Sequence, residues 1–142
     1  NELRTLLEKE LAKAHIEAKF TWDIGATENE MQEALLLIRQ AQWRWDFGVS
    51  SHGGSFHAPQ ETMRILGHGL NKVFQARMLI SKVLVAHGYT DNVPLPDITT
   101  KEKAQQYIGL DMAVEKADKD KFLKEIVPEW LQKAKANGRI VN

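Results

Sequence analysis

Two histidines, His52 and His57, stand in a segment that runs from Ser50 to Pro59 with the sequence Ser-Ser-His-Gly-Gly-Ser-Phe-His-Ala-Pro. Glycine adopts backbone angles that other residues resist, and proline fits the first position of a helix, where no N–H is needed. The segment therefore predicts a flexible loop that holds His57 just ahead of a helix. Because imidazole binds borderline metals, the two histidines are candidate ligands of a metal or cofactor. Capping of the loop by His57 is the structural alternative.

The sequence contains none of the other common catalytic or cofactor-binding motifs that we looked for. The 142 residues contain no cysteine, which excludes disulfides, thiol catalysis and covalent haem attachment within them. We find no G-x-S-x-G elbow, no phosphate-binding glycine motif and no E-x-x-H pair on two helices. For His15 and His68 we expect structural roles. The tryptophans Trp22, Trp43, Trp45 and Trp130 are interpreted as core or interface anchors.

Three long helices precede and follow the histidine loop. Apolar residues recur at close to a helical period over residues 3–22. Thr27-Glu28-Asn29-Glu30 has the spacing of a capping box, which predicts a second helix continuing towards residue 49. A third helix is predicted over residues 59–87, with Gly88 as its left-handed C-terminal cap.

Shorter elements follow. Residues 89–98 contain two prolines and predict an extended strap. Thr99-Thr100-Lys101-Glu102 predicts a second capping box, for a short helix that ends at Gly109. The last helix is predicted over residues 111–136, with a break or kink near Pro128. The fold class is all-α: long antiparallel helices and shorter C-terminal ones, joined by a Gly/His loop and a Pro-containing strap.

Composition indicates one globular domain over 1–142, made of long helices (1–88), strap (89–98) and C-terminal helices (99–142). Nineteen basic residues balance nineteen acidic ones, which argues against a nucleic acid as partner.

The chain opens Asn-Glu-Leu-Arg without an initiator methionine, so we expect a piece of a longer polypeptide. A helix over 59–87 would span about 43 Å, more than the roughly 37 Å diameter of a compact chain of this size. A second layer is therefore expected, from the rest of the polypeptide or from a second copy.

Several separated blocks of the sequence resemble one known family. The blocks are 5–22, 25–28, 42–47, 51–53, 56–59, Glu61, 96–105 and 108–110. Through them, essentially the whole chain resembles the C-terminal helical third of pentahaem cytochrome c nitrite reductase, the ammonia-forming enzyme.

The resemblance implies a periplasmic homodimer that reduces nitrite to ammonia with five c-type haems and a calcium ion. The catalytic haem and the calcium ligands would lie upstream, so this piece alone is expected to be inactive, with no cofactor bound. His57 matches the histidine that supplies the distal axial ligand of a bis-histidine, electron-transferring haem, and so would bind haem iron. The long helices would form the dimer, and a periplasmic or membrane-anchored cytochrome would donate electrons.

Two alternatives stay open on the residues themselves. One is a stand-alone helical interaction domain, and the other is a small metal-binding bundle that uses His52 and His57. Several C-x-x-C-H motifs and one C-x-x-C-K motif in the upstream coding sequence would favour the enzyme.

Overall fold

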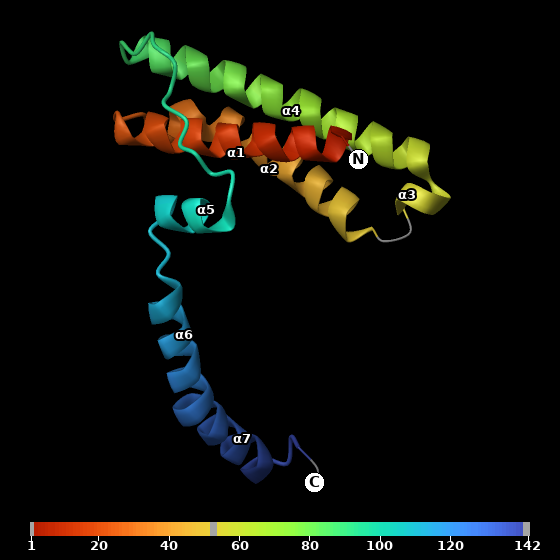
Figure 1. Ribbon diagram of the computed structural model, residues 1–142, viewed down its shortest axis with the longest axis vertical. Coiled ribbons are helices and arrows are strands. Elements are labelled where there is room, and N and C mark those ends of the chain that lie inside the picture. Colours follow the sequence, from red (N-terminus) through yellow and green to blue (C-terminus); the bar gives the residue numbers. More distant parts are fainter. Residues whose placement is uncertain (1, 52–53, 141–142) are drawn as a thin grey trace. The chain divides into compact units, whose positions relative to one another are not determined.

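The chain folds as helices joined by turns and one extended strap (Figure 1). The computed structural model describes residues 2–51 and 54–140, and over those residues it contains no strand. The predicted all-α class is confirmed. No helix within the described residues is long and apolar enough to cross a membrane. The chain divides into two compact units, Asn1–Leu95 and Pro96–Asn142.

The first unit contains three long helices and one short one: α1 (Glu2–Asp23), α2 (Glu28–Ser50), α3 (Gly54–His57) and α4 (Pro59–Ala86). α2 runs antiparallel to both α1 and α4 (Figure 1). The bounds of the three long helices agree with the predicted ones to within about one residue, a margin at which assignments of helix ends ordinarily differ. The short α3 was not predicted, because its four residues lie in a segment whose glycines indicate a loop.

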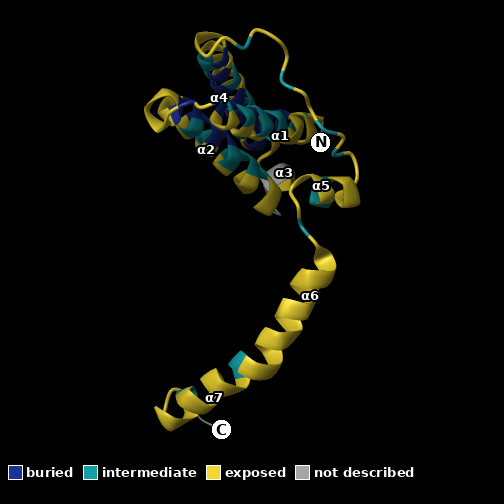
Figure 2. Cartoon of the chain, turned by 90° about the vertical axis from the view of Figure 1, so that its left-hand side faces the viewer, coloured by how far each residue is buried: buried dark blue, intermediate teal, exposed yellow. Residues whose placement is uncertain are grey.

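The core lies between α1, α2 and α4, whose buried faces meet in Figure 2. Its side chains recur at spacings of three and four residues along each helix, so that each helix buries one stripe. Many of them are alanines, which allow the helix axes to approach closely. The core residues on these helices are Leu7, Leu11, Ala14, Ala18, Met31, Ala34, Leu37, Ile38, Ala41, Leu66, Val73, Ala76, Ile80 and Leu84.

Two glycines lie where α4 comes closest to its neighbours. A Cβ atom added to Gly69 would lie 2.8 Å from Leu7 Cδ2 and 3.3 Å from Arg44 Cβ. A Cβ on Gly48 would lie 2.8 Å from Leu66 Cδ2. Leu7 and Leu66 are fully buried, so neither side chain has free space into which to retreat. Both positions therefore require glycine for packing rather than for backbone conformation.

The predicted capping box at the start of α2 is present. The Thr27 N–H donates to Glu30 Oε2 at 2.7 Å, and the Glu30 N–H donates to Thr27 Oγ1 at 3.4 Å. His87 Nε2 lies 3.1 Å from Glu30 Oε1, which ties the end of α4 to the start of α2. The hydrogen bonds from Thr27, followed by the one from His87, lower the pKa of Glu30. Gly88 has a φ of 82°, which confirms the predicted left-handed cap of α4.

A partly buried ion-pair cluster joins α1 to α4. Arg77 donates from Nε and Nη2 to the two oxygens of Glu17, at 2.8 and 2.6 Å, and from Nη1 to Glu10. Lys13 donates to the other oxygen of Glu10 at 2.7 Å. The hydrogen bonds to Glu17 contribute most to raising the pKa of Arg77. Because the Glu10 side chain is only 7% exposed, it depends on these cations.

The extended strap is confirmed over residues 89–98, and Tyr89 at its start packs on Phe20 with ring centroids 4.8 Å apart. In the second unit, α5 (Lys101–Tyr107) is followed by α6 (Met112–Lys121), the π-helical turn η1 (Phe122–Ile126) and α7 (Val127–Ala136). None of the described residues of these helices is buried (Figure 2).

The N-terminal cap predicted for α5 is wrong, whereas the irregularity predicted near Pro128 is confirmed. Thr100, not Thr99, caps α5, by accepting the Lys103 N–H at 3.3 Å. Thr99 is instead held by Asp97, which accepts both its N–H and its hydroxyl. The irregularity expected near Pro128 takes the form of η1, which ends two residues before the proline. A π turn lets the helix continue past a residue that has no N–H.

Replacing Gly69 by alanine tests the close approach of the helices. Alanine has a helix propensity up to about 1 kcal/mol better than glycine, but overpacking against Leu7 and Arg44 costs about 1–3 kcal/mol. We expect a net loss of about 1 kcal/mol in the free energy of unfolding, measured by urea denaturation. The control is Gly67→Ala, where nothing lies within 4 Å of the added Cβ. That variant should be stabilised by about 0.5–1 kcal/mol, and equal gains in both variants would contradict the packing argument.

Replacing Arg77 by methionine tests the ion-pair cluster. The change leaves Glu10 and Glu17 facing each other without the guanidinium, and Glu10 is too buried for water to compensate. Since Lys13 remains and Arg77 is partly exposed, we expect a loss of about 2–3 kcal/mol, measured by urea denaturation. Lys19→Met, which removes an exposed pair with Asp23, should cost less than about 1 kcal/mol. A loss no larger than that of the control would refute the role assigned to Arg77.

Candidate functional site

His57, the predicted ligand, is the last residue of α3, and its side chain is exposed. Its ring contacts Phe56 edge to face, with centroids 5.3 Å apart and planes at 86°. The imidazole makes no hydrogen bond or ion pair with any other residue that the structure describes. Loop capping, the structural alternative for His57, therefore finds no support in the described contacts.

The backbone next to His57 is held firmly by the start of α4. The Ala58 carbonyl accepts the Thr62 N–H at 3.0 Å and the Thr62 hydroxyl at 3.1 Å. Pro59 occupies the first turn, and Thr62 is buried at 4% exposure. α3 also packs against α4. The exposed imidazole is thus presented from a rigid base.

No other histidine within the described residues joins His57 in a cluster. His52 lies outside the described residues, so the predicted pair of His52 and His57 has no observed geometry. Within residues 2–51 and 54–140, no three His, Asp or Glu side chains are placed to share a metal ion. His15 is an exposed residue on α1, whereas His87 contacts Glu30 as described above.

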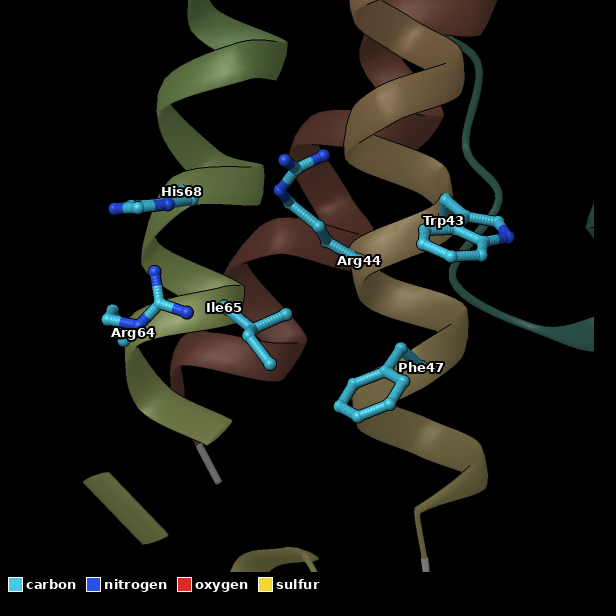
Figure 3. A pocket seen from close by; sticks show the side chains of 6 residues that line it. All are labelled: Trp43, Arg44, Phe47, Arg64, Ile65 and His68. Carbon is cyan, nitrogen blue, oxygen red and sulfur yellow. The ribbon is translucent and has the colours of Figure 1, made fainter. Parts of the chain in front are cut away.

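A cleft of about 270 Å³ opens between α2 and α4, at the ends that are joined through α3 (Figure 3). Six side chains line it, three from each helix, and we call it the α2–α4 cleft: Trp43, Arg44, Phe47, Arg64, Ile65 and His68. Phe47 and Ile65 face each other across the space between the helices (Figure 3). Arg44 extends from α2 towards α4, at the level of His68.

The charge on the α2–α4 cleft is positive. Arg64 is held by Glu61, which accepts from Arg64 Nε at 2.8 Å and from Nη2 at 2.5 Å. These hydrogen bonds lower the pKa of Glu61 and raise that of Arg64. Arg44 is half-buried and donates only to the Gln40 carbonyl, at 2.7 Å, with no carboxylate beside it in the described chain. One guanidinium in the cleft therefore lacks a counter-charge.

The α2–α4 cleft was missed from the sequence. Of the two roles predicted for Trp43, core or interface anchor, its 74% exposure excludes the core, and the residue lines the cleft. His68 was expected to be structural, and it lines the cleft. A signal was present: each helix contributes residues at positions i, i+1 and i+4, which in a helix share one side. The spacing alone does not predict the cleft, because the sequence does not show that the two helices pack together at these turns.

The chain matches the cytochrome c552 family over residues 1–138. It is 74% identical to a protein of Bacteroides fragilis named "Cytochrome c-552", 71% identical to one of Bacteroides thetaiotaomicron and 62% identical to one of Porphyromonas gingivalis, both of the same name. Each alignment covers 99% of this chain and 28% of the relative. The chain thus spans little more than a quarter of the length of these curated relatives.

These matches correct the assignment made from the sequence. The resemblance was to a pentahaem ammonia-forming nitrite reductase, whereas the family and the relatives are named for cytochrome c552 and none of those names states reduction of nitrite. The predictions of a nitrite reductase activity, of a C-terminal third of such an enzyme, and of nitrite as substrate are replaced by the cytochrome family. The five haems and the calcium ion depended on that assignment and are not retained.

A cytochrome of the c type carries haem c, which requires axial ligands for its iron and cysteines for its covalent attachment. The residues present fit the first requirement. His57 offers an exposed imidazole nitrogen on a rigid base, which is what an axial ligand of haem iron requires. The chain contains no cysteine, so these 142 residues cannot form the thioether links. A ligand role fits, and covalent attachment by this stretch does not. With a family match over residues 1–138 and a relative that is 74% identical over 99% of the chain, the chain belongs to the cytochrome c552 family.

Proposed function

We propose that this chain serves electron transfer in a c552-type cytochrome, by supplying His57 as an axial ligand to a haem c. The observation that carries the proposal is the exposed His57 imidazole, which makes no hydrogen bond or ion pair with any described residue and stands at the start of a helix. Family membership supplies the haem.

The local residues suit such a ligand. A haem with two axial imidazoles is low-spin and passes electrons without an open coordination position. For its part, the chain must present a neutral imidazole and keep it in place. The bonds from Thr62 to the Ala58 carbonyl fix the backbone, and the edge-to-face contact with Phe56 limits rotation of the ring.

The proposal extends to the setting of the protein. Because the chain has no cysteine, the haem must be attached by residues outside this stretch. We place the protein in the periplasm, where a cytochrome, itself periplasmic or anchored in the membrane, would deliver the electrons.

Replacing His57 by alanine in the haem-loaded protein tests the ligand role. Loss of one axial imidazole should convert a low-spin haem to a high-spin or five-coordinate form, visible in electronic absorption and in electron paramagnetic resonance. Added imidazole should restore the low-spin signal. His15→Ala, an exposed histidine on α1, is the matched control and should leave the spectra unchanged. Unaltered haem spectra in folded His57→Ala protein would overturn the proposal.

We also propose that two copies associate through the long helices. An apolar stripe on α4 is exposed to solvent, and its members recur at helical spacing: Met63, Phe74, Met78 and Val85 are 43–62% exposed. Exposed apolar patches of this kind mark association surfaces, and a second copy would supply the second layer that helices of this length need.

Sedimentation checks the association. We expect the full-length protein to sediment as a dimer, and Met78→Glu to weaken dimerisation at least tenfold by placing a charge within the stripe. Gln75→Glu introduces the same side chain three residues away and should have little effect. A monomer at all concentrations, or equal effects of the two changes, would contradict the proposed surface.

A further inference from the structure

We propose that the α2–α4 cleft binds the propionate edge of the haem that His57 ligates, with Arg44 as the principal cation. This inference rests on the proposed ligand role of His57. It adds a second point of contact, which would set the reduction potential of that haem and fix the rotation of its plane.

The charge of the cleft is the first argument. A haem propionate is a carboxylate, and guanidinium is the cation whose paired N–H groups match a carboxylate. Arg64 already has its carboxylate in Glu61. Arg44 has none among the described residues and is half-buried, so its charge is only partly compensated by water. Arg44 is therefore the group to which an anionic ligand gains most by binding.

The walls of the cleft are the second argument. Phe47 and Ile65 face each other below the guanidinium of Arg44 (Figure 3). Phe47 is 48% exposed although it lines a concave surface, so a ligand entering here would bury apolar area. Inorganic phosphate or a small carboxylate could pair with Arg44 but would leave the apolar side chains of Phe47 and Ile65 exposed to water. The combination fits an anion carried on a flat apolar body, which describes the edge of a porphyrin.

Position is the third argument. Arg64, Ile65 and His68 lie in the first three turns of α4, and the residue immediately before this helix is Ala58, next to His57. At 1.5 Å per residue, Arg64 is about 8 Å along the helix from Pro59. On α2, the lining residues belong to the last two turns. The cleft and the ligand thus share one end of the helix pair, as two contacts with a single rigid group must.

The effect on the haem follows from electrostatics. Ferric haem carries one more positive charge than ferrous haem, so a bare propionate favours the ferric state. A guanidinium paired with that propionate cancels its charge and favours the ferrous state. Removing Arg44 should therefore lower the reduction potential, while the axial ligands and the low-spin spectrum stay unchanged.

The test is a spectroelectrochemical titration of the full-length, haem-loaded protein and its Arg44→Gln variant. We expect a several-fold lower ratio of reduced to oxidised haem at a fixed potential for one low-spin haem. Arg44→Lys, which keeps the charge but not the paired N–H groups, should recover part of the shift. Arg39→Gln is the matched control, because Arg39 is an exposed arginine on α2 outside the cleft, and it should leave the titration unchanged.

The outcomes separate this inference from the ligand proposal. If His57→Ala removes a low-spin signal but Arg44→Gln titrates like the parent, the ligand role stands and the propionate site is wrong. If His57→Ala leaves the haem spectra unchanged, the inference fails with the proposal on which it rests. Thermal unfolding shows whether Arg44→Gln is folded. Equal shifts for Arg44→Gln and Arg39→Gln would mean a long-range charge effect and would also overturn the site.

Discussion

The close approach of α4 to α1 and α2 is the constraint on which the rest of the first unit depends. Gly69 and Gly48 contribute no side chain of their own to the contact, and fully buried Leu7 and Leu66 occupy the space that a Cβ would need. The alanines of the core continue the same tight spacing along the helices. Because the helices are this close, their remaining side chains interlock in one register, and the partly buried Glu10–Arg77–Glu17 cluster joins α1 to α4 within it.

The candidate site is a consequence of that register. Beside the contact of Gly48 with buried Leu66, the last turns of α2 and the first turns of α4 enclose the α2–α4 cleft. Arg44 illustrates the connection, since its Cβ borders the contact at Gly69 while its guanidinium reaches into the cleft. Packing between these helices thus positions a cation at the same end of the α2–α4 pair as the exposed His57 imidazole.

Local signals along the chain predicted much of this structure. The capping box at Thr27, the proline at the start of α4 and the glycine at its end each act within one turn of backbone, and each was found as predicted. The box predicted at Thr99 was wrong because Asp97, two residues earlier, offered Thr99 a competing set of hydrogen bonds. The blocks that resembled a nitrite reductase pointed to a haem protein, whereas the family is that of cytochrome c552.

The sequence by itself determined the helices, their caps, the lack of any thiol for haem attachment and the candidacy of His57, since these depend on residue type and on spacing within one segment. Only the tertiary structure decided that His57 is exposed without a hydrogen-bond or ion-pair partner among the described residues, that Trp43 lies at a rim rather than in a core, and that Arg44 and His68 face one cleft. The physical reason is distance along the chain. Periodicity shows which residues share a side of one helix, but the facing of two helices is set by packing between residues far apart in sequence.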